Sequence, residues 1–193
     1  MTVLEATAIS SQIAQALRYL EHVGIVHGRL SCRNVMIESK NNGSIVLHDF
    51  GLGEEDCSFL PFQVPEITKE NYSSQNCDVW AFGMTLLQIF NGGNIPFSEL
   101  NNESILTNLK GQIRPGKPDD CPPCIYEIAL RCLLNIPNQR PTITQLCTAL
   151  DNIYISMTSL SFEFREEIFG VSDEEIETFE ESPENEHPIE QCQ

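Results

Sequence analysis

Hydrophobic residues recur at helical spacing in several stretches of the chain. Between residues 4 and 21 they return every three or four positions, and Gly24 follows, which predicts an amphipathic helix ending near that glycine. Residues 78–90 are apolar almost without interruption, which predicts a core helix buried on all sides. The same pattern predicts shorter helices over residues 103–110, 125–134 and 143–154.

Two short apolar runs in the first third of the chain follow a different pattern. Residues 35–37 and 45–47 flank the sequence Asn41-Asn42-Gly43, which is typical of a tight turn between strands. The sequence therefore predicts a β-hairpin at this position. We expect a mainly α-helical fold that contains this one small hairpin.

Charge divides the chain into two parts. The formal net charge is -17, and residues 161–193 hold 12 acidic side chains and one Arg. Such a balance argues against nucleic acid as a partner. Apolar periodicity fails after about Ser159, and the following residues are mostly acidic and polar. We therefore expect a folded domain over residues 1–159 and an acidic, disordered tail over residues 160–193.

The cysteines and the hydrophobic runs indicate the cellular compartment. Among the 8 cysteines, Cys121 and Cys124 form a C-P-P-C sequence, but no second pair stands at zinc-binding spacing, which favours a turn over a metal site. No apolar run approaches the roughly 20 residues that span a bilayer. We expect free thiols in a reducing cytoplasm, and no membrane span.

Five short motifs occur in an order that resembles the protein kinase family. They are His27-Gly28-Arg29-Leu30-Ser31-Cys32-Arg33-Asn34, similar to the catalytic loop H-R-D-L-x-x-x-N; Asp49-Phe50-Gly51; Val64-Pro65-Glu66; Asp78-Val79-Trp80-Ala81-Phe82-Gly83; and Arg140-Pro141-Thr142. The resemblance covers about residues 4–154 and leans toward the tyrosine-kinase branch. It implies the C-terminal lobe of the α+β kinase fold.

The resemblance also shows where this chain departs from the family. The position of the catalytic base, an Asp in the family, holds Arg29. A guanidinium stays protonated and cannot accept the proton of a substrate hydroxyl. Another carboxylate could take over the role, although the loop offers none. Alternatively, Arg29 could pair with Asp49 or with a phosphate and lock the site. No catalytic residue is therefore expected to be intact.

Some family positions that bind the cofactor are retained. By resemblance, Asn34 and Asp49 would hold Mg²⁺ and Met36 would face the adenine of ATP. The chain begins just before the first helix of the C-terminal lobe, so we expect no N-terminal lobe and weak or absent binding of ATP and Mg²⁺. His27 and Phe50 would then form part of an exposed apolar patch.

Other motif residues have structural roles in the resemblance. Glu66 and Arg140 would form a buried ion pair, Asp78 would hydrogen-bond the backbone of the catalytic loop, and Gly51 completes the D-F-G motif. Gly28 replaces an Arg that, in most kinases, binds the phosphorylated activation loop. The segment between Leu52 and Gln63 is short and contains no Tyr.

Three functional hypotheses remain open at this point. The first is a catalytically impaired, pseudokinase-like binding or regulatory module with a protein partner on the interlobe face. The second is a truncated tyrosine kinase whose full-length form binds ATP. The third is an incomplete product without a stable fold. Arg29 argues against enzymatic activity even in the second case.

Overall fold

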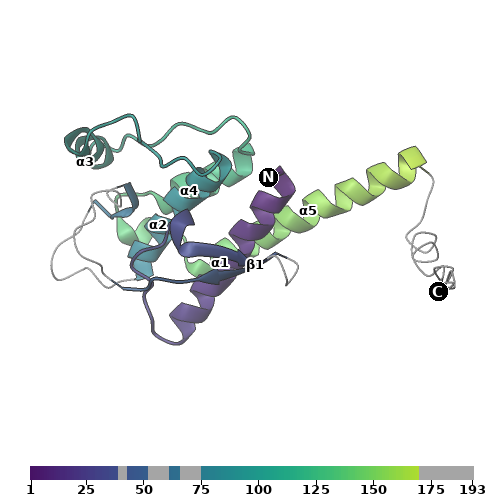
Figure 1. The fold of residues 1–193 in the computed structure, drawn as a ribbon, viewed down its shortest axis with the longest axis horizontal. Coiled ribbons are helices and arrows are strands. Elements are labelled where there is room, and N and C mark those ends of the chain that lie inside the picture. Colours follow the sequence, from purple (N-terminus) through teal and green to yellow (C-terminus); the bar gives the residue numbers. More distant parts are fainter. Residues whose placement is uncertain (39–42, 52–60, 66–74, 170–193) are drawn as a thin grey trace, which may run out of the picture. The chain divides into compact units, whose positions relative to one another are not determined.

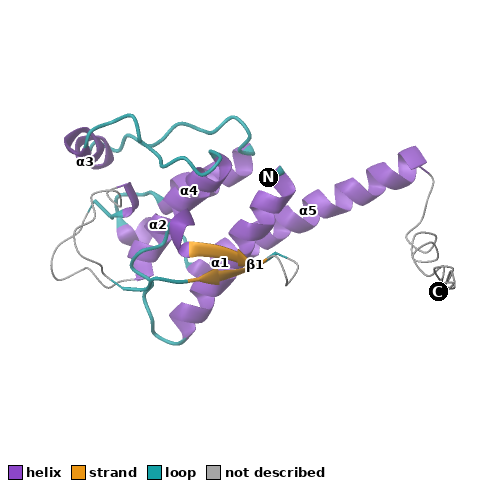
Figure 2. Ribbon diagram, in the orientation of Figure 1, coloured by secondary structure: helices purple, strands orange, loops and turns teal. Residues whose placement is uncertain are grey.

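The computed structural model describes residues 1–38, 43–51, 61–65 and 75–169, with side chains as far as residue 159. Contacts divide the chain into a compact unit over Met1–Ile155 and a second unit over Ser156–Gln193. The first unit contains nearly all of the described helices and the hairpin (Figures 1 and 2). The predicted mainly helical fold with one small hairpin is confirmed.

The first helix, α1 (Val3–His22), follows its predicted bounds closely. Thr2 caps its N-terminus, because the Thr2 hydroxyl accepts a hydrogen bond from the Glu5 amide while the Glu5 carboxylate accepts one from the Thr2 amide. Gly24, which ends this segment, adopts φ 73°, a conformation that glycine reaches without strain. The chain then turns back toward the loop that precedes the hairpin.

The hairpin consists of β1 (Val35–Glu38) and β2 (Ser44–Leu47), which pair in antiparallel register. Met36 lies directly opposite Val46, and both side chains are exposed. Ile45 lies opposite Ile37 and packs against the core. The predicted turn at residues 41–43 lies mostly outside the described residues. A short 3-10 helix, η1 (Cys32–Asn34), leads directly into β1.

Helix α2 (Gln75–Phe90) forms the centre of the core. Every residue from Asp78 to Phe90 is buried, as its continuous apolar pattern predicts. Gly83 lies where α4 (Pro123–Cys132) crosses, and a Cβ atom placed on it would come within 2.6 Å of the Cβ of Cys132. The close approach of the two helices therefore requires glycine at this position.

Smaller elements complete the first unit. Helix α3 (Asn102–Lys110) is capped by Asn101, whose side chain accepts a hydrogen bond from the Ser104 amide. The 3-10 helix η3 (Pro137–Gln139) precedes the last helix. Trp80 of α2 lies between two guanidinium groups, those of Arg114 at 5.1 Å and Arg140 at 5.0 Å from its ring. Residues distant in sequence thus meet at one core tryptophan.

The last helix corrects one prediction. Helix α5 runs from Ile143 to Phe169, well past the predicted end at Tyr154 and into the region expected to be disordered from residue 160. The sequence contains neither proline nor glycine between Pro141 and Gly170. Nothing in that stretch therefore breaks the helix, even though its apolar periodicity is lost. Residues 170–193 of the expected tail lie outside the described residues.

Candidate functional site

The loop that carries the first motif is held by Asp78 from the start of α2. One oxygen of the Asp78 carboxylate accepts the amide of His27 at 2.7 Å, and the other accepts the amide of Gly28 at 2.8 Å. Burial raises the pKa of Asp78 to about 6, although the two amide donors act in the opposite direction. The residue predicted to bind the loop backbone therefore does so through both of its oxygens.

Gly28 has a conformation that suits glycine. Its φ is 74°, in the left-handed region where a side chain would cost about 1–2 kcal/mol. Its amide is one of the two donors that Asp78 fixes, so the loop is held in this shape. The sequence pattern interprets Gly28 only as the loss of a receptor for the phosphorylated activation loop. The backbone shows in addition that this position has a conformation that favours glycine.

His27 is fully buried, which corrects the expectation that it would be part of an exposed apolar patch. Its ring stacks on Phe50 with ring centroids 4.7 Å apart, and Phe50 remains about half exposed. The Arg29 amide donates to Nδ1 of His27, so the ring proton is on Nε2, which has no partner among the described residues. Burial is the main cause that lowers the pKa of His27. The imidazole is therefore neutral and covered by Phe50.

Arg29 forms an ion pair with Asp49. The guanidinium Nη1 of Arg29 lies 2.9 Å from Oδ2 of Asp49, with side-chain exposures of 22% for Arg29 and 49% for Asp49. Asp49 has φ 60°, a left-handed conformation that Asp tolerates better than most residues. Gly51 follows at φ 104°, and its amide donates to the carbonyl of His27 at 2.8 Å. Of the two pairings considered for Arg29, the one with Asp49 is present.

Asn34 lies at the end of η1 and is buried. Its side-chain nitrogen donates to the carbonyl of Arg29 at 2.6 Å, which ties it to the same loop. The amide of His48 donates to the carbonyl of Asn34 at 3.1 Å and connects the loop to the end of β2. Met36, the predicted adenine neighbour, is 54% exposed. The site therefore brings Arg29, Asn34 and Asp49 together.

The remaining predicted structural residues lie apart from the ion pair. Arg140 donates from Nε to the carbonyl of Leu134 at 2.8 Å and from Nη1 to the carbonyl of Asn76 at 2.9 Å. Glu66, its predicted partner, lies outside the described residues, so that ion pair stays a prediction. These bonds fix Arg140 against the start of α2.

Two contributing residues were missed in the sequence. Gln88, a polar residue within the apolar helix α2, accepts the amide of Cys32 at 3.0 Å and donates to the carbonyl of Gly93 at 3.0 Å. Its position in an otherwise apolar run was the available signal. Arg114 donates to the carbonyls of Leu133 and Leu109 and stacks on Trp80. No pattern in the sequence indicated that role.

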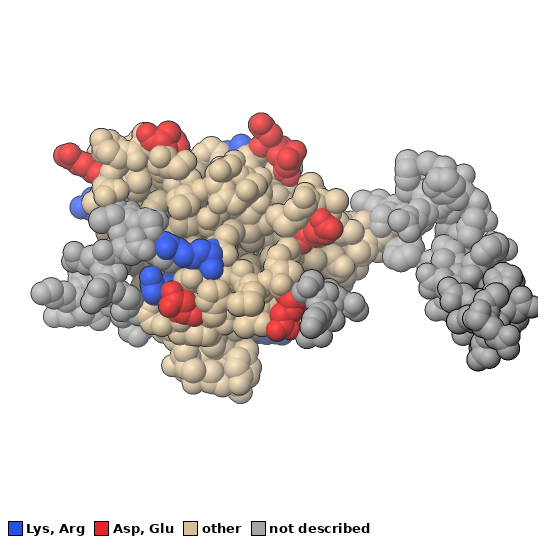
Figure 3. Space-filling model, in the orientation of Figure 1, with Lys and Arg blue, Asp and Glu red and all other residues tan. Residues whose placement is uncertain are grey.

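The described residues carry no ready-made cluster for a metal ion. No group of three or more His, Cys, Asp or Glu side chains within the described ranges is arranged to hold one. Figure 3 shows a small group of Lys and Arg side chains left of the centre of this face. Among the described helices, none is both long and apolar enough to cross a membrane.

Comparison with known proteins assigns the class. The family model described as protein tyrosine and serine/threonine kinase matches residues 1–150. The chain therefore belongs to the protein kinase family, and it is tyrosine-kinase-like. Its order of loop, D-F-G motif and central helix agrees with that assignment, as does its small two-stranded sheet.

Two curated relatives refine the comparison. Protein-tyrosine kinase 6 of Mus musculus is 31% identical over 163 residues, which cover 79% of this chain and 36% of that protein. Activated Cdc42 kinase Ack of Drosophila melanogaster is 35% identical over 152 residues, which cover 71% of this chain and 14% of that protein. The chain thus spans only a minor part of the length of these kinases.

Proposed function

We propose that this chain is a catalytically impaired kinase domain that acts as a binding or regulatory module. The observation that carries the proposal is the ion pair between Arg29 and Asp49. It combines two obstacles to phosphate transfer in one contact. The position of the base is a permanent cation, and the carboxylate that would hold the metal already has a counter-charge.

The first obstacle concerns the proton. A catalytic base must accept a proton from the substrate hydroxyl, and a guanidinium has no acceptor atom. Arg29 also places a positive charge next to the position where the hydroxyl would lose its proton. A cation there would stabilise an alkoxide through its field, but it cannot remove the proton. The family's reaction therefore lacks its acceptor in this loop.

The second obstacle concerns the metal. When bound in this family, Mg²⁺ neutralises the charge that develops on the transferring phosphate. Mg²⁺ requires near-octahedral coordination and prefers free carboxylates. Here Asp49 is paired with Arg29, whereas the Asn34 side chain donates to the loop carbonyl through its nitrogen, a bond that does not occupy the Oδ1 atom that would bind a metal. The residues present therefore do not fit a divalent cation without breaking the ion pair, which supports weak or absent binding of Mg²⁺ and ATP.

The hairpin supports a binding role. Met36, Ile37 and Val46 are exposed on its strands, and Phe50 is exposed just after it. Exposed apolar residues in one region are typical of an interface. Met36 and Val46 lie opposite each other on one face of the hairpin, and a protein partner that covers the interlobe face would bury these two side chains. We place the module in the cytoplasm, where the free cysteines of the described residues would remain reduced.

One observation favours a second candidate, a truncated tyrosine kinase whose full-length form binds ATP. Asn34 and Asp49 keep the residue types that bind the metal in the family, and the chain matches only part of each relative. In that case nucleotide binding would require Asp49 to release Arg29. The two candidates differ in whether ATP with Mg²⁺ binds.

Two assays on the full 193-residue chain test the proposal. In the first, the melting temperature is measured with and without millimolar ATP and Mg²⁺, for the unmodified chain and for Arg29→Asp. We expect no shift for the unmodified chain. A ligand raises the melting temperature measurably only when its concentration is comparable to its dissociation constant or higher, and we expect the dissociation constant for ATP with Mg²⁺ to lie well above the millimolar range. Arg131→Asp is the matched control, since Arg131 forms an exposed ion pair with Glu127 on α4.

The second assay measures transfer of phosphate to a tyrosine-containing peptide. We expect no transfer above the rate without protein. Transfer by the unmodified chain, abolished by Asp49→Ala but retained in Arg131→Asp, would contradict the proposal. A thermal shift without transfer would instead support the second candidate.

A further inference from the structure

The two outer edges of the hairpin differ in how they are covered. Strand β2 contacts α1, and Gln12 of that helix bonds to the outer edge of β2 (Figure 2). Its Oε1 accepts the amide of Ile45 at 3.1 Å, and its Nε2 donates to the carbonyl of Gly43 at 3.3 Å. One side-chain amide thus supplies the donor and the acceptor that a neighbouring strand would supply. Strand β1 forms the opposite edge of this two-stranded sheet.

The register of the hairpin determines which backbone groups of β1 point outward. In an antiparallel pair, opposing residues alternate between those that bond to each other and those whose N–H and C=O groups point away. Ile37 lies opposite Ile45, whose amide points away from β1 toward Gln12. The bond from the His48 amide to the Asn34 carbonyl, in the same register, agrees with this alternation. The N–H and C=O of Ile37 therefore both face the outer edge of β1.

This edge carries backbone groups that are not bonded within the described part of the chain. Neither the N–H nor the C=O of Ile37 has a hydrogen-bond partner among the described residues. Val35, two residues earlier, has the same orientation, and because its amide donates to the carbonyl of Cys32, its carbonyl oxygen is left at the edge. Donors and acceptors in a row along a strand are complemented together by the backbone of another extended segment. The edge of β1 thus favours a ligand in strand conformation.

The side chains of β1 at this edge are apolar and exposed. On one face of the hairpin, Val35, Ile45 and Leu47 pack against the core. Ile37 points to the same face but is 52% exposed, and Met36 on the opposite face is 54% exposed. A strand beside β1 would place one side chain next to Ile37 and the following one on the face of Met36. Two consecutive apolar, β-branched residues fit these two positions.

Charge decides between two occupants of the edge. A second copy of this chain could pair through its own β1, since a strand edge is complementary to itself. Each copy has a formal net charge of -17, however, so two copies repel each other. A segment of another protein that carries neutral and basic residues is attracted instead. The charge of the chain therefore favours a partner segment over a second copy.

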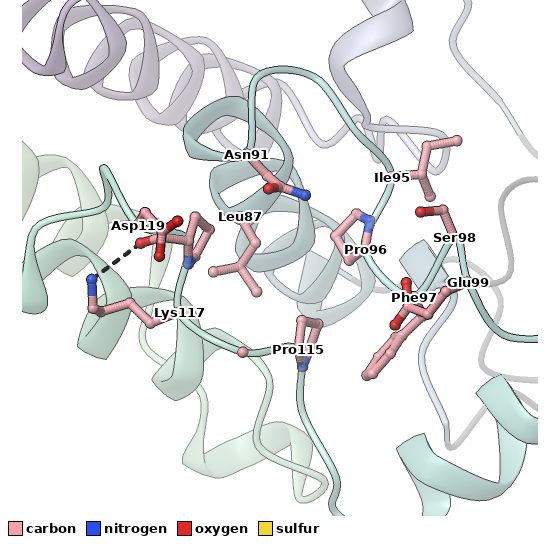
Figure 4. Close-up of a pocket in the computed structure, with 12 residues that line it drawn as sticks. Leu87, Asn91, Ile95, Pro96, Phe97, Ser98, Glu99, Pro115, Lys117 and Asp119 are labelled. Atoms are coloured by element: carbon pink, nitrogen blue, oxygen red, sulfur yellow. Dashed lines mark hydrogen bonds between the residues drawn. The ribbon is translucent and has the colours of Figure 1, made fainter.

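Polar groups are arranged differently in the open pocket at the end of α2. This pocket of about 320 Å³ is lined by residues of α2 and of the loops 95–99 and 115–119. In Figure 4, Glu99 lies on one side of it, with Lys117 and Asp119 on the other. The Lys117 ammonium donates to the carbonyl of Pro118 at 3.1 Å. The charged groups there do not converge on one ligand, whereas the outward groups of β1 lie in one row.

We propose that the outer edge of β1 binds an extended segment of a partner protein, which adds a third strand to the hairpin. The backbone of the segment donates to the carbonyl of Ile37 and accepts from its amide. Two consecutive apolar, β-branched side chains of the segment lie beside Ile37 and Met36, and its other residues are neutral or basic. This edge rests on the binding role proposed above for the hairpin and gives that partner its chemistry.

The test uses the full 193-residue chain labelled with ¹⁵N and the probe acetyl-Lys-Thr-Val-Val-Thr-Lys-amide. Hydrogen exchange of single amides with solvent is measured during titration. We expect saturating probe to slow exchange of the Ile37 amide about tenfold, because that amide gains an acceptor. The exposed amide of Gly116 is the control and should not change. The probe acetyl-Lys-Thr-Pro-Pro-Thr-Lys-amide has the same charge but cannot pair as a strand, and it should have no effect.

Two variants at one position separate the backbone from the side chain. Ile37→Pro removes the outward N–H, and proline is tolerated at this edge because that N–H takes no part in the hairpin ladder. We expect chemical-shift titrations to show about tenfold weaker binding of the probe, or none. Ile37→Thr keeps the N–H and should bind within about threefold of the unmodified chain. Slow exchange of the Met36 amide, which lies in a bonded pair with Val46, verifies that the hairpin is intact in both variants.

Four outcomes would overturn the proposal. One is unchanged exchange of the Ile37 amide at millimolar probe. A second is an equal effect of the proline probe, which would indicate general attraction of a basic peptide to an acidic chain. A third is binding that survives Ile37→Pro but is lost in Met36→Asp, which would place the partner on the interlobe face and leave the proposed binding role intact. The last is slowing of Ile37 exchange by protein concentration alone, which would assign the edge to a second copy.

Discussion

The two ends of the catalytic loop differ in how firmly they are held and in what they can do. At the inner end, Asp78 is buried and accepts two backbone amides. At the outer end, Arg29 and Asp49 meet in a pair that is partly exposed. The inner contact holds the backbone of the loop, whereas the outer contact pairs the residue at the position of the family's catalytic base with the D-F-G aspartate. The comparison indicates that the loop backbone is held by a residue, Asp78, that takes no direct part in phosphate transfer.

The largest effect is expected from Asp78→Ala. Two buried amides would lose their acceptor, and each buried donor without a partner costs about 1–3 kcal/mol. We expect the free energy of unfolding to fall by about 3 kcal/mol, measured by urea denaturation. Asp119→Ala, at an exposed position, is the control and should change stability little. An equal loss in the two variants would show that Asp78 does not anchor the loop.

The packing that supports the inner end can be tested at Gly83. In Gly83→Ala the new methyl group would overlap Cys132 and approach the carbonyl oxygen of Ala129 at 3.0 Å. Overpacking of this kind costs about 1–3 kcal/mol. The thermal midpoint should fall clearly, while Gly116→Ala, which has open space, should be nearly neutral. If Gly83→Ala were neutral, the close approach of α2 and α4 would be wrong.

The pH dependence of stability distinguishes the buried carboxylate. The pKa of Asp78 is about 6 in the folded chain against an ordinary value of 3.8, so the folded state binds more protons between those values. The contribution of Asp78 to stability therefore falls as pH rises through this window and is lowest above pH 6. From pH 5 to pH 8 it should fall by roughly 1 kcal/mol.

Other groups titrate over the same range, including His27, whose pKa is lowered. The measurement is therefore the difference in unfolding free energy between the unmodified chain and Asp78→Ala at each pH. Because His27 is present in both, its titration largely cancels. A difference that stays constant from pH 5 to pH 8 would show that Asp78 is not perturbed by burial.

The smallest effect on stability is expected at the outer end. Arg29→Gln removes an ion pair that is partly exposed, at 22% for Arg29 and 49% for Asp49, and exposed pairs contribute about 0–1 kcal/mol. We expect a change under about 0.5 kcal/mol by urea denaturation. Arg131→Gln, which breaks the more exposed pair with Glu127, should behave alike. A loss of several kcal/mol in Arg29→Gln alone would make Arg29 a structural anchor.

The fold was largely predictable from sequence because its signals are local. The continuous apolar run over 78–90 could only be a buried helix, and the strand runs on either side of Gly43 gave the hairpin. The end of α5 was not predictable from apolar periodicity, since that helix continues without a packed stripe. Its only sequence signal was the absence of helix-breaking residues before Gly170.

The site was predictable as a set of positions but not as a set of contacts. Motif spacing identified Arg29, Asn34 and Asp49, yet it left open whether Arg29 would pair with Asp49 or with a phosphate. It placed His27 and Phe50 together in an exposed patch, whereas in the structure His27 is buried and only Phe50 remains about half exposed. Gln88 was missed because a single polar residue in a core helix has many possible partners.

The most direct test of the central claim measures whether the Arg29–Asp49 pair closes the metal position. Mn²⁺ is titrated into the ¹⁵N-labelled chain, and paramagnetic broadening is read at the amides of residues 49–51. We expect those amides in Arg29→Ala to broaden at about tenfold lower Mn²⁺ than in the unmodified chain, with Arg131→Ala unchanged. Equal broadening in the unmodified chain and Arg29→Ala would contradict the claim.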